Sequence, residues 1–460
     1  MPYTPNSVIP AKAGIHVRLK TPDSGLRGND DASLPSSPRK RGSIFPELTT
    51  MTFLRTAMTA MLLATAAPAL ANAQGSTSGA ADSASSSAAD SVADSVADSS
   101  ATRAKGEKPA KPGLDFSGLV FGDFHMSTDE ASKAANGGKA PNEFDIGRAY
   151  LTFRMPAGDR FRVRVTTDIK QQDGSNGAYD GWIVRLKYAY LQYDIAKSAE
   201  PDHFAAVARV GMLHNVVIDH QQEFWPRYLN KVATETYDFF ASADLGVATE
   251  LTLPGQAGEF YATLVNGSGY DHPESDRFKD YAARLSLTPL GKSEGYFSTL
   301  TISPWIYSGK SASRFASDPT DPITAGLDRT RYGVFAGVRD RRLTLGGEWA
   351  RKVDEIESGA TPLARGVARN TGELYRAFAI ARPLEWASGA DRSSVGLIFR
   401  WDQFTPDRDA SGKLRYLLGG VFWEPTSKAA LALDYQRTEP VDGLGGDRSE
   451  RWYVHWQVAF

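Results

Sequence analysis

The sequence predicts an all-β fold, a transmembrane antiparallel β-barrel of about 16 strands with an inward-folded third loop. Three observations predict it. The final strand has one apolar face and one mostly polar face, the chain from residue 113 onward is a series of alternating segments separated by turns, and the connections alternate between short and long. Together they describe strands that face lipid on one side and water on the other.

Residues 451–460 form the most informative segment. Apolar side chains occupy one parity and mostly polar ones the other, as a strand between lipid and water requires. The closing aromatic resembles the C-terminal signature of bacterial outer-membrane barrels, which the insertion machinery reads. The resemblance implies a barrel-assembly signal made of Trp452, Val454, Trp456, Val458 and Phe460. The alternative is an ordinary two-faced strand of a soluble sandwich.

The chain before the barrel divides into three parts. Residues 51–73 have a short basic start, an Ala-rich apolar stretch and a cleavage point near Ala73, which is typical of a secretory signal peptide. Residues 1–50 resemble translated intergenic repeats, and we expect a non-native upstream extension or, alternatively, a genuine disordered one. Residues 74–112 are of low complexity, and we expect a flexible periplasmic segment rather than a short helical stalk.

The composition limits the possible chemistry. The 460 residues include no cysteine, which excludes disulfides, thiolate metal sites and a cysteine nucleophile. A net charge of −2 argues neither for nor against nucleic acid, and we expect no nucleic-acid partner. The mean hydropathy of −0.35 fits a barrel whose apolar positions alternate with polar ones.

We expect about sixteen strands from residue 113 to residue 460. Alternation and turn residues place them approximately at 114–125, 143–155, 159–170, 182–195, 205–213, 243–253, 258–266, 280–289, 297–307, 329–339, 342–351, 372–381, 393–404, 413–423, 428–438 and 450–460. Their length of about ten residues suits a tilted strand that crosses an outer membrane.

The connections between the predicted strands alternate in length. Short turns are expected at 156–159, 254–258, 339–341 and 425–427. Longer polar loops are expected near 126–142, 171–181, 214–242, 267–279, 308–328, 352–371, 405–412 and 439–449. Short inner turns and longer outer loops are typical of outer-membrane barrels, whereas a soluble sandwich has no reason to alternate in this way.

The strands also show the two faces that a barrel requires. In 182–195 the alternation groups Tyr188 and Tyr190 with Trp182 on the apolar face, opposite Arg185. A lipid-facing arginine near the midplane would cost about 2–4 kcal/mol, so the charged residues are expected to point into a watery lumen. The predicted basic pore lining consists of Arg148, Arg154, Arg162, Arg164, Arg185, Lys187 and Arg209.

Four segments carry a resemblance to a known family. The stretches 113–124, 148–154, 242–247 and 265–270 look, in this order, like those of the phosphate-selective porin O/P family. The resemblance covers residues 113–460. It implies a sixteen-stranded trimeric porin with a basic, anion-attracting channel and a third loop folded into the pore. The expected walls also carry acids, including Glu250, Glu348, Asp402 and Asp434.

The longest predicted loop, near 214–242, is rich in aromatic and charged residues. A loop of this length is usually functional, and we expect it to narrow the pore. The predicted constriction residues are His214, Asp219, His220, Glu223, Trp225, Arg227 and Tyr228. The spacing of Asp219, His220 and Glu223 is not specific for a metal, and polar residues that face water are the simpler interpretation.

An outer-membrane hydrolase would need a nucleophilic serine aligned with a histidine. His125 and His455 lie in predicted strands, but no serine motif accompanies either of them. We therefore expect no enzymatic activity and no cofactor or metal.

The sequence thus predicts a porin of the bacterial outer membrane for passive diffusion of small hydrophilic solutes, with a preference for anions such as phosphate. In the competing interpretation, the arginines pair with Asp219 and Glu223 of the long loop and brace it. A barrel with a binding or adhesion role is the alternative for the whole protein, and a barrel hydrolase is a more remote one. The expected partners are outer-membrane lipid and lipopolysaccharide, the insertion machinery, small anionic solutes and two further copies in a homotrimer.

Overall fold

The computed structural model describes residues 113–172, 181–197, 203–274, 276–313, 326–359, 364–388 and 394–460. The predictions for residues 1–112, namely the upstream extension, the signal peptide and the low-complexity segment, lie outside the described residues. The barrel expected from residue 113 onward falls within them.

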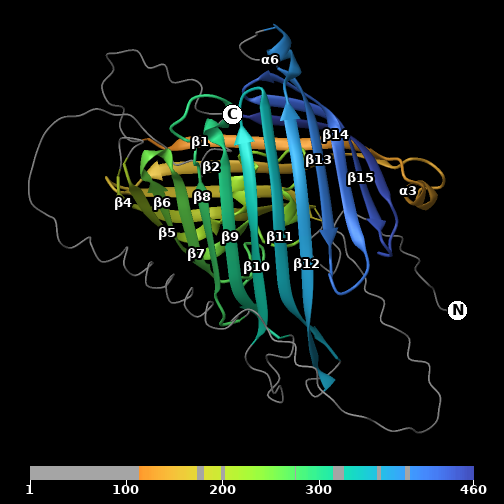
Figure 1. The fold of residues 1–460 in the computed structure, drawn as a ribbon, viewed down its shortest axis with the longest axis horizontal. Coiled ribbons are helices and arrows are strands. Elements are labelled where there is room, and N and C mark those ends of the chain that lie inside the picture. Colours follow the sequence, from red (N-terminus) through yellow and green to blue (C-terminus); the bar gives the residue numbers. More distant parts are fainter. Residues whose placement is uncertain are drawn as a thin grey trace, which may run out of the picture. The chain divides into compact units, whose positions relative to one another are not determined.

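Sixteen antiparallel strands close into a barrel in which each strand pairs with its neighbours in sequence, as predicted (Figure 1). The strands are β1 (Asp115–Ser127), β2 (Asn142–Pro156), β3 (Phe161–Gln172), β4 (Gly181–Ala196), β5 (Ala205–His214), β6 (Ala243–Leu253), β7 (Gly258–Val265), β8 (Asp280–Leu287), β9 (Thr301–Ser311), β10 (Leu327–Arg339), β11 (Leu343–Ser358), β12 (Gly366–Ala381), β13 (Val395–Thr405), β14 (Lys413–Thr426), β15 (Ala429–Val441) and β16 (Ser449–Ala459).

The last strand pairs with the first and closes the ring. Val458 faces Val120 in the β1–β16 register, and Phe460 exchanges two backbone hydrogen bonds of 2.9 Å with Gly118. The Phe460 ring covers Gly118 so closely that a Cβ at this position would lie 2.2 Å from the ring. A glycine is therefore needed here for the terminal aromatic side chain to occupy its place on β1.

The helical elements are short and lie in the connections. They are α3 (Glu130–Ala135), α4 (Ile218–Gln222), α5 (Ala233–Thr236), α6 (Pro383–Ser388) and the 3-10 turns η5 (Pro254–Gln256) and η6 (Tyr296–Thr299). In the described part of the chain, no helix has the length and apolar character needed to cross a membrane.

The connections alternate between the two ends of the barrel. The turn end carries short turns such as 340–342 and 427–428, and the loop end carries longer connections such as 215–242. The prediction of a loop at 352–371 is wrong, because β11 and β12 continue through most of it as a paired hairpin that extends beyond its neighbours (Figure 1). Both faces of this hairpin are polar, so the alternation that identifies the other strands is missing.

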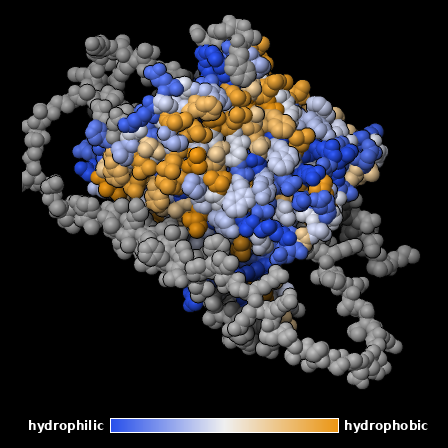
Figure 2. All heavy atoms as spheres, viewed as in Figure 1, coloured by the Kyte–Doolittle hydropathy of each residue, from blue (hydrophilic) through white to orange (hydrophobic). Residues whose placement is uncertain are grey.

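Large apolar side chains point outward around the barrel and remain exposed. In β16 and at the C-terminus, Trp452, Val454, Val458 and Phe460 are 45 to 53% exposed and Trp456 is half-buried, while their role as an assembly signal stays a prediction. In Figure 2, apolar side chains gather across the middle of the visible face, while hydrophilic ones gather toward its edges. This surface fits contact with lipid.

A β-bulge in β4 corrects the predicted faces of that strand. The register with β3 shifts at Lys187, which is an extra residue without a partner in β3. A bulge reverses the parity that points inward. Leu186 is 45% exposed on the outer face, whereas Tyr188 and Tyr190 are 4% and 6% exposed inside the barrel. The prediction that both tyrosines share the lipid face is therefore wrong.

Candidate functional site

Residues 215–242, called the inner segment from here on, connect β5 to β6 and contact opposite walls of the barrel. On one wall, Tyr188 of β4 donates a hydrogen bond to Asp219 at 2.9 Å. On the other, Arg376 of β12 donates one to Gln221 at 3.2 Å. β4 and β12 lie half a ring apart in the closed barrel. A segment that reaches both walls has to cross the interior, so we infer that the inner segment lies in the lumen.

Cationic side chains of the wall hold the inner segment by its backbone. Arg284 of β8 donates to the Val216 carbonyl at 2.7 Å, and Arg400 of β13 donates to the Lys231 carbonyl at 2.6 Å. The same kind of bond joins Arg339, Lys352 and Arg331 to the carbonyls of Glu223, Tyr237 and Phe239. These charge-assisted bonds satisfy backbone carbonyl groups of the inner segment, and those to Val216 and Phe239 are buried.

The inner segment also packs apolar side chains against the wall formed by β8–β15. Ile218, Trp225 and Phe239 are 0% exposed, and the Trp225 ring meets the Phe378 ring of β12 at a centroid distance of 5.3 Å. Full burial of one large apolar side chain stabilises a fold by about 1.5–3 kcal/mol. The inner segment is therefore a packed part of the fold, and it covers this side of the lumen.

The wall formed by β1–β3 is not covered in this way. Inward side chains on the covered wall, such as Ser303 and Leu418, are 0% exposed. On β2, by contrast, Arg148 and Arg154 keep 15% and 20% of their side chains exposed. Further half-buried inward residues here are Leu119, Asp123, His125, Tyr150, Arg164 and Lys170. Solvent reaches these inward side chains of β1–β3, which we call the open wall.

The predicted constriction residues lie in two different parts of the structure. Asp219, His220, Glu223, Arg227 and Tyr228 belong to the inner segment, as expected. His214 does not, because it is the last residue of β5 and stacks on Tyr261 with a centroid distance of 4.8 Å. Trp225 is 0% exposed and packs against the covered wall. His214 therefore lies outside the inner segment, whereas Trp225 lies within it, and the narrowing of a passage by these residues stays a prediction.

Arg227 and Glu235 form an ion pair within the inner segment. Arg227 Nη2 donates to Glu235 Oε1 at 2.9 Å, and Nη1 donates to the other carboxylate oxygen. Burial alone would raise the pKa of Glu235, but the Arg227 guanidinium lowers it to about 2. The pair stays charged at ordinary pH and joins two turns of the segment.

His220, Glu223 and Glu259 form a buried cluster between the inner segment and the wall. His220 Nδ1 lies 4.0 Å from a carboxylate oxygen of each glutamate, and Arg284 pairs with Glu259. Burial, and after it the Glu259 charge, raises the pKa of Glu223 to about 8. Burial and the Arg284 charge hold the pKa of His220 well below its usual range. At neutral pH, Glu223 is therefore protonated and His220 is neutral.

The same histidine lies beside a serine that the sequence analysis did not single out. His220 Nε2 is 2.9 Å from Ser303 Oγ, so a serine, a histidine and a carboxylate come together. Such a set can activate a nucleophile. Here Ser303 is 0% exposed and also bonds to Ser286 at 3.0 Å, so a substrate carbonyl has no access to its hydroxyl. Among the described residues, no group of three or more His, Asp or Glu is placed to hold a metal ion.

Most of the predicted basic lining pairs with carboxylates outside the inner segment. The pairs are Arg148 with Asp168 at 3.4 Å, Arg154 with Asp115 at 3.8 Å, Arg162 with Asp194 at 2.6 Å, Arg185 with Asp271 at 3.0 Å and Arg209 with Glu250 at 2.7 Å. The interpretation that these particular arginines pair with Asp219 and Glu223 is wrong. Arg162 and Arg185 are thus paired as well, and the pairs reduce the excess positive charge of the predicted lining.

Lys187 and Arg164 lie against aromatic rings of the same wall. Lys187 Nζ is 4.8 Å from the centre of the Tyr150 ring and 5.4 Å from that of Tyr188. The Arg164 guanidinium lies 4.9 Å from the centre of the Tyr188 ring. Cation–π contacts of this kind hold a cation in place without neutralising its charge. Lys187 is 5% exposed, and both cations also act on the carboxylate of Asp219 in the inner segment.

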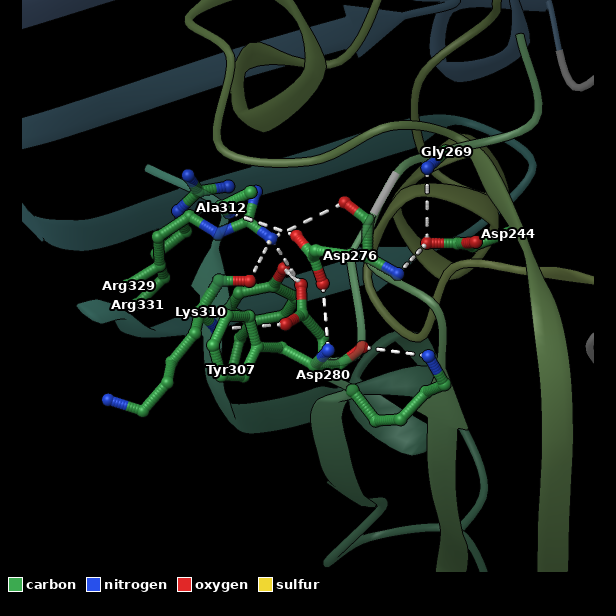
Figure 3. Close-up of polar contacts among 12 residues, drawn as sticks. Asp244, Gly269, Asp276, Asp280, Tyr307, Lys310, Ala312, Arg329 and Arg331 are labelled. Atoms are coloured by element: carbon green, nitrogen blue, oxygen red, sulfur yellow. Dashed lines mark hydrogen bonds and ion pairs between the residues drawn. The ribbon is translucent and has the colours of Figure 1, made fainter. Parts of the chain in front are cut away.

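The carboxylate of Asp280 fixes the loop end of β8–β10 next to this site. Asp280 accepts hydrogen bonds from the Tyr307 hydroxyl, from the Lys310 amide at 3.1 Å and from Arg329 at 2.8 Å (Figure 3). Asp280 is 0% exposed, so its charge depends on these donors. These hydrogen bonds join β8, β9 and β10 where their long connections begin.

The connection between β7 and β8 is held in the same region and reaches the open wall. Asp244 accepts the Gly267 and Gly269 amides at 2.8 and 3.2 Å (Figure 3). The following Tyr270 donates to Asp168 of β3 at 3.0 Å. This connection therefore places Tyr270 and Asp271 over the loop end of β3 and β4, where they contact Asp168 and Arg185.

The sequence analysis missed the cations that hold the inner segment. Alternation places Arg284, Arg331 and Lys352 on the inward parity of their strands. That signal could have found them as lumen residues. It could not have found their partners, because these are backbone carbonyls of a distant connection.

Comparisons with known proteins identify the fold. No protein-family model matches the sequence, and no curated protein matches it. The structure is similar to OmpF of Salmonella typhi, solved in complex with daunomycin, with a TM-score of 0.50 and 12% identity over 76% of this chain and 98% of that one.

Two further similar structures are outer-membrane proteins. An anion-selective porin from Comamonas acidovorans has a TM-score of 0.47 and 12% identity over 76% of this chain and 100% of that one. The outer membrane channel DcaP of Acinetobacter baumannii has a TM-score of 0.47 and 12% identity over 78% of this chain and 100% of that one. Identity this low shows a shared fold alone, and the resemblance to the phosphate-selective O/P family stays a prediction. The chain thus has the sixteen-stranded barrel fold of bacterial outer-membrane porins.

Proposed function

We propose that the protein is an outer-membrane channel through which small hydrophilic solutes diffuse passively. The contrast between the two walls carries this proposal: the inner segment buries nearly all inward side chains of β8–β15, while several inward side chains of β1–β3, among them Leu119, Tyr150 and Lys170, remain only half-buried. A barrel of sixteen strands is wide enough for an aqueous passage beside such a segment. Diffusion through it requires no chemical step.

The charges beside the open wall support a preference for anions, as the resemblance to the phosphate-selective family also implies. Arg164 and Lys187 lie against aromatic rings beside this wall, and Lys170 is half-buried on it. The acids Asp168 and Asp123 weaken the local potential, so the proposed preference is moderate. Positive side chains in a water-filled passage raise the local concentration of anions.

The outward apolar surface supports a location in the outer membrane. Lipid and lipopolysaccharide would contact this surface, and the insertion machinery would read the strand that ends at Phe460. A homotrimer is the oligomeric state we propose, in line with the family resemblance.

Planar-bilayer recording in a KCl gradient tests the proposal. The full chain should give stepwise conductance with a reversal potential on the anion side. Arg162→Glu combined with Arg164→Glu should move that potential toward cations. A folded barrel that gives no conductance would contradict the channel and favour the binding or adhesion alternative.

A further inference from the structure

Aromatic side chains form a row along the open wall and the adjoining β16. The His125 ring lies 5.2 Å from the Tyr453 ring, which stacks on His455 at 4.8 Å. Closer to the turn end, the Phe121 and Tyr150 rings are 6.0 Å apart. The registers of β16, β1 and β2 place all five on the inward face. We call these five residues the aromatic row.

Several members of the aromatic row keep part of their surface open. His125, Tyr150 and Tyr453 are half-buried, whereas the rings beneath the inner segment are fully covered. Tyr228 of the inner segment meets the His455 ring edge-on at a centroid distance of 6.5 Å and covers this end of the row. Rings that serve only to pack the barrel would be covered on both faces, so His125, Tyr150 and Tyr453 offer aromatic surface to a solute, whereas Phe121 and His455 are buried beside them.

Cations lie beside the rings. Arg148 faces Phe121 in the β1–β2 register, and Lys187 lies over the Tyr150 ring at 4.8 Å. At the loop end, Arg451 donates to the Tyr453 hydroxyl at 3.4 Å. A ring beside a cation suits a ligand that has both a ring and an anionic group, because the rings stack and the anionic group accepts charge-assisted hydrogen bonds.

Resting on the proposed channel function, we infer that the aromatic row is a binding track for organic anions that contain an aromatic ring, such as aromatic carboxylates. The solute ring stacks on the half-buried members of the row, and its carboxylate faces Arg148, which is 15% exposed beside Asp168, with the buried Lys187 next to the Tyr150 ring. Asp123, which accepts a hydrogen bond from His125 at 2.8 Å, repels the carboxylate from the loop-end half and directs it toward these cations. An inorganic anion has no ring and uses the cations alone.

A series of three carboxylates tests the inference on the unaltered full chain. The KCl current through planar bilayers is titrated with benzoate, cyclohexanecarboxylate or acetate. Benzoate should reduce the current at concentrations about two- to tenfold lower than cyclohexanecarboxylate, as expected for one added aromatic contact. Acetate should have the weakest effect. Equal potency of all three, with a normal KCl current, would overturn the track and leave the channel intact. Absence of any KCl current would overturn the channel and the track with it.

Substitutions at Tyr150 test the same inference independently. Tyr150→Leu keeps an apolar side chain but removes the aromatic face, and Tyr150→Phe keeps the ring. The leucine variant should need about two- to tenfold more benzoate, with the acetate response unchanged, and the phenylalanine variant should match the parent. Tyr375→Leu, at an outward position that is 40% exposed, is the matched control. An unchanged benzoate response in folded Tyr150→Leu, judged by heat-modifiable migration on SDS gels, would overturn the inference.

Discussion

The Tyr188 hydroxyl donates to both carboxylate oxygens of Asp219, at 2.9 and 3.0 Å. The contact joins the inner segment to β4, on the wall opposite to the one against which it packs. Tyr188 reaches this position only because the bulge at Lys187 turns it inward. The bulge in β4 thus allows the contact that joins the inner segment to this wall.

Tyr188→Phe should loosen the inner segment and leave the barrel folded. Asp219 loses hydrogen bonds that are worth about 1.5–3 kcal/mol when the acceptor is charged. Hydrogen exchange of the amides around Asp219, followed by mass spectrometry, should accelerate by roughly tenfold or more. Tyr193→Phe, on the outer face of the same strand, is the control. Unchanged exchange in the Tyr188 variant would show that this contact does not hold the segment.

Arg400→Met should destabilise the barrel strongly. Arg400 binds Asp402 through Nη2 at 2.6 Å and Nε at 3.0 Å, and both residues are 0% exposed. Removing one partner of a buried pair leaves an uncompensated charge, which costs about 3–5 kcal/mol. Urea unfolding in detergent should show this loss. Lys413→Gln, which breaks an exposed pair with Asp442, should change little. Comparable midpoints for the two variants would contradict the account.

The packing of the inner segment should weaken as the pH rises. In the unfolded chain Glu223 ionises near its ordinary pKa of 4.5, whereas burial and the Glu259 charge raise its folded pKa to about 8. Between these values the folded state keeps a proton that the unfolded state has lost, so stability falls as pH increases. Hydrogen exchange of residues 218–225 at pH 5, 7 and 9 should accelerate along this series. Glu223→Gln should flatten the profile, and a flat profile in the parent would contradict the assignment.

Phe460→Asp should reduce the amount of assembled barrel. The Phe460 ring is 53% exposed on the outer face and lies 6.1 Å from the Phe116 ring, so the substitution places a charge where lipid and an aromatic neighbour are expected. The heat-modifiable band in outer-membrane fractions measures assembly. Phe460→Tyr retains the ring and should assemble as the parent does. Equal assembly of the aspartate variant would refute the signal.

Alternation was enough to predict the strands, because a wall between lipid and water imposes a period of two on each of them. In β13, for example, Phe399 points outward and is 47% exposed, while Arg400 and Asp402 have the opposite parity and point inward. The faces of Tyr188 and Tyr190 escaped prediction, because one extra residue changes the parity of a strand without changing its composition.

The groups that bind the charged side chains of the lumen could not be predicted from the sequence. Parity places Arg400 in the lumen, but its bond to the Lys231 carbonyl depends on the path of the inner segment. That path follows from contacts between residues far apart in the chain, such as His220 with Ser303. Periodicity describes one strand at a time, so it carries no information on these contacts.

We propose that water reaches the half-buried inward side chains of β1–β3 and is excluded from the wall beneath the inner segment. Because the chain has no cysteine, single cysteines can report this directly. Leu119 on β1 is half-buried and Leu418 on β14 is 0% exposed, and both point inward. Leu397 on β13 points outward toward lipid and serves as the control.

Modification of these three variants in bilayers by a charged, membrane-impermeant thiol reagent is the most direct measurement. Leu119→Cys should react quickly and its single-channel conductance should change on modification. Leu418→Cys and Leu397→Cys should react far more slowly and keep their conductance. Protection of Leu119→Cys, or reaction of Leu418→Cys at the same rate, would contradict the proposed division of the lumen.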